Sequence, residues 1–452
     1  MPYLRVRAAH HLSSLAAGVR LTAAAIALSL GAGCMSTSDL LTVQNPNSVD
    51  ASVFDDPSNA QLMVNSVIGD FECAYGSFIM GEGIATDELH DATLQNGNWN
   101  LDRRDNGFTS GFYGINPCTT TTGIYTPLST ARAEADKAIA RLTGWSAAQV
   151  PNRITFLAQT NLYAGFSYAT LGMAMCQAAF DLGPLVDQKG VFALAETRFS
   201  DAITAAQSAG LTTIQNAALL GRARVRLFLH NNAGAIADAQ LIPSGFVFNA
   251  TMDAANTRRF NPAFTSISTN GTSTVEASTR ALTTENNELD PRSTTIKLNT
   301  RPADGINTIY IPAKYNAATL TAGEALPLPI ARYAEAQLIL AEAQGGTAGV
   351  TIINNMRAAV GLSPYTGAID AASMKTLIAG ERQRVLFLEG FRAFDIERFS
   401  LPLVPAVGAP YVGGGVYGGT VCLPVPDIER FANPNIKGAD VIDGVQGHFS
   451  PP

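Results

Sequence analysis

The chain has 452 residues, of which 46% are hydrophobic and 15% are charged, and its formal net charge at pH 7 is −7. That length is ample for a large hydrophobic core, as one big domain or two entangled ones. The negative charge, with no cluster of lysine and arginine, argues against nucleic acid as a partner and against a polybasic membrane-binding patch.

The first 33 residues are predicted to be an export signal that is not part of the fold. Three arginines precede an apolar run over 21–30 that is too short to span a bilayer as a mature helix. Small residues then lead to Cys34 in a pattern that resembles a bacterial lipobox, although Gly31 stands where that pattern prefers leucine. We expect Cys34 to become the lipidated N-terminus and to anchor the protein. Cleavage by ordinary signal peptidase is the alternative.

Residues 34–50 are polar and mixed, and we predict a short tether there. The run Asp55-Asp56-Pro57-Ser58 predicts the start of a helix, because acidic residues and proline are favoured in a first turn. Apolar side chains follow at helical spacing over 60–75.

Residues 76–125 are rich in glycine, asparagine and threonine, and aromatic side chains are concentrated there. Trp99 lies among amide and guanidinium side chains. An aromatic face can stack on a pyranose while such planar groups bond its hydroxyls, so this mixture is typical of sugar recognition. We predict an irregular ligand-binding segment; the alternative is a long loop that one aromatic anchors to the core. The candidate contacts are Asp87, Trp99, Asn100, Arg103, Arg104 and Tyr113.

Helical periodicity dominates from 128 to 241, where apolar residues recur at spacings of three and four. Small residues on the facing sides favour antiparallel helix pairs that approach closely. The spacing is near that of tetratricopeptide repeats, but their sequence pattern is not met. The periodicity alone predicts an α-solenoid-like frame. Its expected helices cover 128–142, 151–182, 191–209, 216–229 and 233–241.

Residues 243–329 are rich in threonine, asparagine and serine and contain short extended runs over 245–249, 293–298 and 308–312. We predict a mixed insertion that packs on the helical frame. Tyr310 and Tyr315 are second-rank candidates for ligand contact.

The stretch Glu381–Phe399 places acids and arginines among apolar residues. Two acid–arginine pairs are three residues apart, which is neighbour spacing on a helix. A surface helix would not carry these charges on the side that faces the core, so we predict a helix, broken at Gly390, with partly buried ion pairs. A catalytic set is the alternative. The expected structural residues are Arg382, Glu389, Arg392, Asp395 and Arg398.

Four cysteines remain besides Cys34, an even number in an exported chain, and four allow three connectivities. We favour a disulfide between Cys73 and Cys118, which would fix the base of the aromatic segment. The other, between Cys176 and Cys422, would join the C-terminal segment to the helical frame. Zinc is the alternative, but the spacing C-x-x-C is absent and histidines are few, so we predict no metal site.

Motifs for catalysis are also absent: the sequence has no G-x-S-x-G, no H-E-x-x-H and no Walker lysine loop. The acidic run Asp87–Asp91 lacks the regular spacing of a calcium loop, so a solvated surface is favoured there over a calcium site. No pair of carboxylates is singled out for glycoside hydrolysis. We expect no cofactor and no enzymatic activity.

Several motifs in the same order resemble the SusD/RagB family. The pattern E-R-x-R-x-L-x-x-E-G-x-R-x-x-D-x-x-R over 381–398 is similar to that family's C-terminal signature. Residues 332–343 and 352–362 are similar to its paired helices, and 422–435 to its closing segment. The resemblance implies a mainly α (α+β) fold: a superhelix of TPR-like helix pairs with a ligand-binding insertion of loops and short strands.

The resemblance also implies a domain plan. Residues 51–452 would form one domain, in which a helical frame carries irregular ligand-side segments. The frame would cover about 127–242 and 331–400, and the irregular segments about 76–126 and 243–330.

For function, the resemblance implies a lipoprotein of the outer membrane that faces the cell exterior. It would capture oligosaccharides and pass them to a TonB-dependent transporter. Two alternatives stay open: a peptide cargo for the same kind of protein, and a secreted glycosidase or lyase.

Overall fold

The computed structural model describes residues 51–93, 95–105, 111–120 and 122–447. The chain divides into two units, Met1–Asp55 and Asp56–Pro452. In the first unit, the described part is the 3₁₀ helix Ala51–Asp55. The expected signal peptide, Cys34 and the tether lie outside the described residues, and the account below concerns the second unit.

Helices make up most of this unit, which confirms the predicted fold class. The helices in the first half are α3 (Ala60–Ile84), α4 (Asn96–Asp102), α5 (Phe112–Ile115), α6 (Tyr125–Gly144), α7 (Arg153–Ala174), α8 (Gln188–Ala209), α9 (Thr212–Phe228) and α10 (Asn232–Ala239). Those in the second half are α11 (Pro262–Phe264), α12 (Leu320–Glu324), α13 (Tyr333–Gln344), α14 (Gly346–Ala358), α15 (Ala371–Val385), α16 (Arg392–Arg398) and α17 (Asp427–Ala432).

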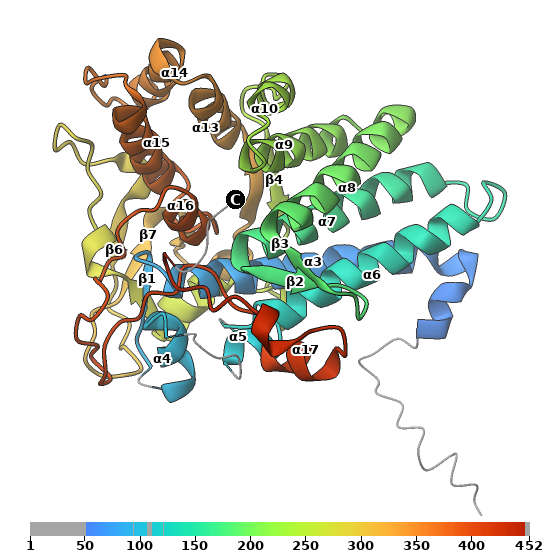
Figure 1. Ribbon diagram of the computed structural model, residues 1–452, viewed down its shortest axis with the longest axis horizontal. Helices are drawn as coiled ribbons and strands as arrows, with labels where there is room; N and C mark the ends of the chain where they lie inside the picture. Colours follow the sequence, from blue (N-terminus) through green and yellow to red (C-terminus); the bar gives the residue numbers. More distant parts are fainter. Residues whose placement is uncertain (1–50, 94, 106–110, 121, 448–452) are drawn as a thin grey trace, which may run out of the picture. The chain divides into compact units, whose positions relative to one another are not determined.

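The helical frame is formed by consecutive helices that pack each on the next, from α6 through α9 (Figure 1). Glycines let α7 and α8 approach closely. A Cβ on Gly172 would lie 2.6 Å from Cε1 of Phe192, and one on Gly165 would lie 2.6 Å from Cδ1 of Phe199. Small residues on the facing sides therefore have the role that the sequence predicts for them.

Local signals set the ends of α8. The side chain of Asp187 caps its start by accepting from the amide of Gly190 at 2.8 Å. Gly210, at φ 69°, ends it in a left-handed conformation that glycine adopts without strain. The helix predicted over 151–182 ends earlier, at Ala174, because the chain then turns into a short hairpin.

The glycine-rich start of the predicted irregular segment is helical. The helix α3 continues through Gly76 and ends at Ile84, so the irregular segment begins at Ala85, four residues before β1, rather than at Gly76. The reason is packing: a Cβ on Gly76 would lie 3.0 Å from Cγ of Pro262, and one on Gly83 would lie 2.7 Å from Cδ1 of Leu388. These glycines allow close approach and do not break the helix.

Strands form four antiparallel pairs: β1 with β5, β2 with β3, β4 with β8, and β6 with β7. The three extended runs predicted in the insertion are confirmed as β4, β6 and β7. The strands are β1 (Leu89–Asp91), β2 (Gln177–Ala179), β3 (Leu185–Asp187), β4 (Val247–Ala250), β5 (Ser273–Val275), β6 (Thr295–Lys297), β7 (Tyr310–Pro312) and β8 (Leu328–Arg332).

The pair β4–β8 joins the insertion to the frame, because β8 leads directly into α13. Within the described ranges, no helix is both long and apolar enough to cross a membrane.

Candidate ligand-binding site

The stretch Glu381–Phe399 forms two helices with a turn between them. The helix α15 ends at Val385 and α16 begins at Arg392, and in the turn Leu388 and Gly390 have φ of 50° and 79°. A Cβ on Gly390 would lie 2.4 Å from Cε1 of Phe78, which lies on α3. The predicted break at Gly390 is therefore confirmed, and both conformation and space require glycine.

Asp395 is the centre of an interior ion network. Its carboxylate accepts from Nε of Arg382 at 2.7 Å and from Nε of Arg398 at 2.8 Å, and Arg398 also pairs with Glu342 on α13. Asp395 is 3% exposed and Arg382 is 1% exposed. Burial alone would raise the pKa of Asp395, but the two guanidiniums outweigh it and hold that pKa below its ordinary value.

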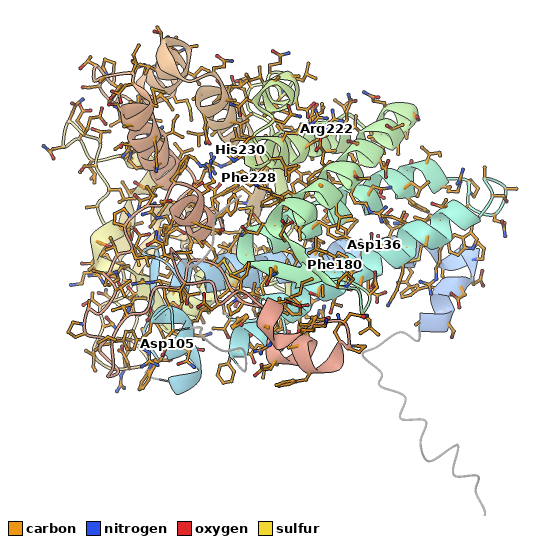
Figure 2. The ribbon with its side chains drawn as sticks, viewed as in Figure 1. Asp105, Asp136, Phe180, Arg222, Phe228 and His230 are labelled. Atoms are coloured by element: carbon orange, nitrogen blue, oxygen red, sulfur yellow. A yellow bond between two sulfur atoms is a disulfide. The ribbon has the colours of Figure 1, made fainter. Side chains whose placement is uncertain are left out.

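Arg398 also connects this network to the helical frame. Its guanidinium lies 5.4 Å from the ring centre of Phe228, which ends α9 and is labelled in Figure 2, and 3.9 Å from that of Phe399. The ring of Phe228 in turn lies 4.5 Å from that of Phe394. The charges of this network are thus enclosed by aromatic rings from α9 and α16, as expected of structural groups.

Glu389 and Arg392 do not pair with each other, although the sequence places them three residues apart. The turn between α15 and α16 breaks the helical geometry on which that expectation rests. Glu389 instead accepts from Lys314 at 2.6 Å and Arg332 at 2.9 Å. Arg392 donates to both carboxylate oxygens of Asp87, at 2.6 and 2.7 Å. The predicted pair is corrected to three long-range pairs.

Three of the predicted ligand contacts lie in the interior: Asp87, Arg104 and Tyr113 are 4%, 1% and 2% exposed. Both oxygens of Asp87 are taken by Arg392, although these two residues border a cavity of ≈ 460 Å³. Arg104 donates to backbone carbonyls of the loop that follows α16. The hydroxyl of Tyr113 donates to the carbonyl of Pro424 at 2.9 Å. The structure gives these side chains contacts within the fold, and their contact with a ligand stays a prediction.

Three other candidates, Trp99, Asn100 and Arg103, lie on or beside α4 and face the loop around 411–415. Arg103 donates to the side chain of Asn100 at 3.0 Å and to the carbonyl of Gly414 at 3.1 Å. A Cβ on Gly413 would lie 2.8 Å from the indole of Trp99. These side chains therefore hold two segments together, and their contact with a ligand stays a prediction.

Tyr310 and Tyr315 differ in exposure. Tyr310, on β7, is half-buried, and the guanidinium of Arg280 lies 4.3 Å from its ring centre. Its contact with a ligand stays a prediction. Tyr315 is 2% exposed, and its hydroxyl donates to the carbonyl of Leu388 at 3.0 Å, so it belongs to the interior.

A cavity of ≈ 430 Å³ lies beside α3, among residues of the described segments 95–98, 112–120 and 252–272. Sites for small molecules in proteins span roughly 300–1,000 Å³ and are mostly apolar. This cavity combines apolar surface with many polar side chains, because twelve of its 21 lining residues carry a hydroxyl or an amide. We call it the polar pocket. Its defining side chains are Gln95, Asn98, Asn116, Thr119, Thr120, Thr122, Thr257, Asn270, Phe112 and Phe260.

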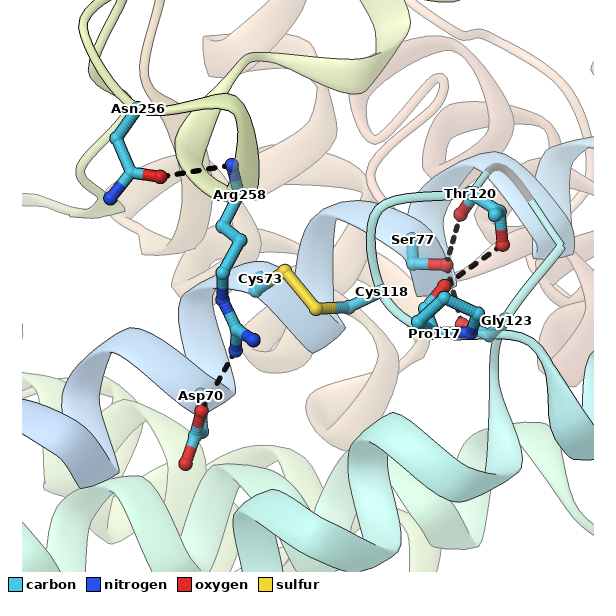
Figure 3. Close-up of a disulfide and its surroundings, with 9 residues drawn as sticks. All are labelled: Asp70, Cys73, Ser77, Pro117, Cys118, Thr120, Gly123, Asn256 and Arg258. Carbon is cyan, nitrogen blue, oxygen red and sulfur yellow. Dashed lines mark hydrogen bonds and ion pairs between the residues drawn. A yellow bond between two sulfur atoms is a disulfide. The ribbon is translucent and has the colours of Figure 1, made fainter. Parts of the chain in front are cut away.

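Both walls of the polar pocket are fixed to α3 (Figure 3). On one side Cys73 and Cys118 form a disulfide, and the hydroxyl of Ser77 donates to the carbonyl of Thr120 at 2.7 Å. On the other side the guanidinium of Arg258 pairs with the carboxylate of Asp70, which lies on α3, at 3.0 Å. The loops that line the pocket are therefore held in place before any ligand arrives, which lowers the entropic cost of binding.

Several groups in the polar pocket remain available to a ligand. Within the part of the chain that the structure describes, the side chains of Gln95 and Asn270 form no hydrogen bond, and both are exposed. Phe112 is 39% exposed. Amides that can both donate and accept, beside an aromatic ring, can bind a molecule that carries several hydroxyls on an apolar ring face.

The predicted ligand contacts and the polar pocket share a segment of the chain but involve different side chains. None of the seven predicted ligand contacts lines the polar pocket. The signal that was missed is the run of threonines directly after Cys118, which the disulfide fixes next to α3. The second wall, near Thr257 and Asn270, comes from the insertion and carries no motif.

Both favoured cysteine pairings are present in the structure. Besides Cys73–Cys118, Cys176 and Cys422 form a disulfide that joins the end of α7 to the C-terminal segment. A backbone bridge between Met175 and Leu423 lies beside it. The long loop that each bond closes restricts the unfolded chain, so both bonds favour the folded state.

The acidic run Asp87–Asp91 is not the solvated surface that the sequence favours. Glu88 is 1% exposed and accepts from the amide of Leu388 at 2.9 Å, and burial raises its pKa well above the ordinary value. His90 lies 3.1 Å from Asp102. Across the described ranges, no group of three or more histidine, cysteine, aspartate or glutamate side chains is arranged to hold a metal ion.

Comparison with known proteins identifies the family that the motifs resemble. Residues 250–439 match the model of the SusD family. No curated protein matches the chain. The resemblance seen in the sequence is therefore confirmed by an independent match that includes the insertion and the C-terminal helices.

Three solved structures share the fold. A SusD superfamily protein from Bacteroides vulgatus is 15% identical, with 88% of this chain and 100% of that chain covered, at a TM-score of 0.60. A SusD-like carbohydrate-binding protein from the same species is 14% identical, with 84% and 97% covered, at 0.61. Surface glycan-binding protein A from Bacteroides thetaiotaomicron, in complex with laminarihexaose, is 15% identical, with 87% and 99% covered, at 0.61.

Proposed function

We propose that the chain, whose residues 250–439 match the model of the SusD family, is a cell-surface protein that captures oligosaccharides for import through its polar pocket. The single observation that carries the proposal is the wall of the pocket: hydroxyls and amides around an exposed phenylalanine, fixed in place on α3. A relative with this fold is a glycan-binding protein in complex with laminarihexaose, which supports the same class of ligand.

In the proposed complex, Phe112 stacks on the apolar face of one sugar ring. Gln95 and Asn270, from different segments of the chain, bond hydroxyls, and the threonines add further donors and acceptors. The pocket has no need of a metal or cofactor for this task. Binding is then driven by a fixed array of polar groups, each of which replaces a bond that the sugar makes with water.

The proposal is tested by isothermal titration with a ligand selected from a panel of neutral oligosaccharides. Loss of the stacking contact in Phe112→Ala removes about 0.5–1.5 kcal/mol, so we expect affinity to fall roughly three- to tenfold. Ile154→Ala, at the start of α7, is the matched control, because Ile154 is also 39% exposed. Unchanged affinity in Phe112→Ala would reject the polar pocket as the binding site. Analysis of the titrated sugar for cleavage products separates binding from glycosidase or lyase activity.

The anchoring and the transporter are part of the same proposal. The basic and apolar leader followed by small residues and Cys34 supports lipidation at the outer membrane. A lipid-anchored protein that faces the cell exterior would hand its cargo to a TonB-dependent transporter. Labelling cells with palmitate tests the anchor: incorporation should disappear in Cys34→Ala. Purification from detergent-solubilised membranes tests the transporter, which should copurify with the wild-type protein.

A further inference from the structure

A second cavity, of ≈ 590 Å³, lies between α13, α14 and the end of α15, and the polar pocket shares no lining residue with it. Apolar side chains such as Pro329, Met356 and Val360 form much of its wall. Its charged lining groups are three cations and one anion. We call it the cationic cavity. These groups are Arg292, Lys314, Arg332 and Glu389.

Two of the cations share the only carboxylate that lines the cavity. Nζ of Lys314 lies 2.6 Å from Glu389, and Nε and Nη2 of Arg332 both lie 2.9 Å from it. Burial lowers the pKa of Lys314; the carboxylate of Glu389 opposes this effect and the neighbouring Arg332 adds to it. The pair of cations therefore carries one positive charge that no lining group neutralises.

The third cation, Arg292, has a donor without an acceptor. Its Nη2 lies 2.8 Å from Glu381 and its Nε lies 2.9 Å from Asp290, so the charge of this guanidinium is balanced. Its Nη1, however, is buried and has no hydrogen-bond partner among the described residues. A buried donor without an acceptor is unfavourable, so a ligand that accepts from it would be stabilised.

We propose that the cationic cavity binds the carboxylate of an organic ligand. The carboxylate accepts from Nη1 of Arg292 and from the free N–H groups of Lys314 and Arg332, and the body of the ligand packs on the apolar wall around Met356. A monoanion fits, because one uncompensated positive charge remains. A dianion such as phosphate would leave an excess negative charge in a half-buried cavity.

Two kinds of ligand carry such a group at the surface of a cell: a uronic acid in an acidic glycan, and the C-terminus of a peptide. Both present a planar carboxylate on a compact body, which suits guanidinium donors. The proposal concerns a site separate from the polar pocket, so it stands or falls independently of the neutral oligosaccharide proposed above.

The experiment is isothermal titration of the full mature chain with digalacturonate, its methyl ester, a free-acid tripeptide and the same tripeptide as C-terminal amide. We expect one free acid to bind at least tenfold more tightly than its neutral counterpart. Which acid does so shows whether the ligand is a uronic acid or the C-terminus of a peptide. Added salt should weaken this binding. If neither acid binds better than its neutral form, or if inorganic phosphate binds more tightly than both acids, the proposal is overturned.

Two variants locate the site. Lys314→Gln keeps a hydrogen bond to Glu389 but removes the uncompensated charge, and Met356→Trp fills the cavity without a change of charge. We expect each to weaken binding of the free acid about tenfold or more, whereas Lys137→Gln, on the exposed face of α6, leaves it unchanged. Circular dichroism verifies that each variant is folded. Wild-type affinity in the folded Met356→Trp variant would overturn the assignment to this cavity.

Discussion

Replacing Asp395 by asparagine tests the interior ion network at the C-terminal end of the frame. The amide keeps the shape of the side chain but removes the negative charge between Arg382 and Arg398. Arg398 keeps its pair with Glu342, whereas Arg382 has no other carboxylate partner in the part of the chain that the structure describes. Because Arg382 is 1% exposed, the substitution leaves one buried guanidinium without compensation.

Loss of one partner from a buried ion pair costs about 3–5 kcal/mol, because the remaining charge stays out of water. We therefore expect Asp395→Asn to lower the free energy of unfolding by about that amount. Replacing both partners, Arg382→Met with Asp395→Leu, should cost less than the single change, since it leaves no unpaired charge in that pair. The comparison separates the electrostatic effect from a general intolerance of substitution at Asp395.

The assay is urea unfolding at pH 7, with the slope compared between variants to verify that the same surface is exposed. Glu134→Gln is the control, because Glu134 pairs with Lys137 at 2.9 Å on the surface, where the side chains are 35% and 58% exposed. Surface pairs contribute about 0–1 kcal/mol. If Asp395→Asn changes stability no more than this control does, the charges of the C-terminal stretch are not a structural network and the reasoning is refuted.

Two further predictions concern packing and pH. Gly172→Ala should lower the free energy of unfolding by about 1–3 kcal/mol, because its Cβ would overlap a phenylalanine ring of α8. Gly69→Ala in α3 is the control: its Cβ would have no atom within 4 Å, so the substitution should be neutral or stabilising. Equal effects of the two variants in urea unfolding would contradict the close approach of α7 and α8. Burial raises the pKa of Glu397 to about 8, so the folded state keeps a proton that the unfolded chain loses near its ordinary pKa of 4.5. Stability should therefore fall by about 1.4 kcal/mol per pH unit as pH rises between these values, and Glu397→Gln should lack this decline; parallel stability profiles of the two proteins would contradict it.

Local signals in the sequence predict much of the fold. The helical spacing from 128 to 241, the extended runs of the insertion and the break at Gly390 each depend on residues that are close in the chain, and each is present. The lengths of α3 and α7 are not predictable in this way. Gly76 looks like a helix breaker until Pro262 is known to pack against it, and Met175, at the end of α7, pairs with Leu423 in the distant C-terminal segment.

The candidate site is less predictable, because polar side chains in an irregular segment look the same whether they face a ligand or a distant partner. Asp87 pairs with Arg392, 305 residues away, and no nearby sequence pattern indicates this contact. The same holds for Tyr113 and the carbonyl of Pro424. The polar pocket is formed by two segments that only the tertiary fold brings together, so its second wall has no local signature.

Hydrogen–deuterium exchange with and without a bound neutral oligosaccharide tests the central claim most directly, since one experiment reports on both the polar pocket and the C-terminal ion network. We predict that the ligand slows exchange in the segments 95–98, 112–120 and 252–272, which line the polar pocket, and leaves 381–399 unchanged. Slower exchange confined to 381–399 would show that the buried charges, rather than the polar pocket, receive the sugar, and would contradict the account.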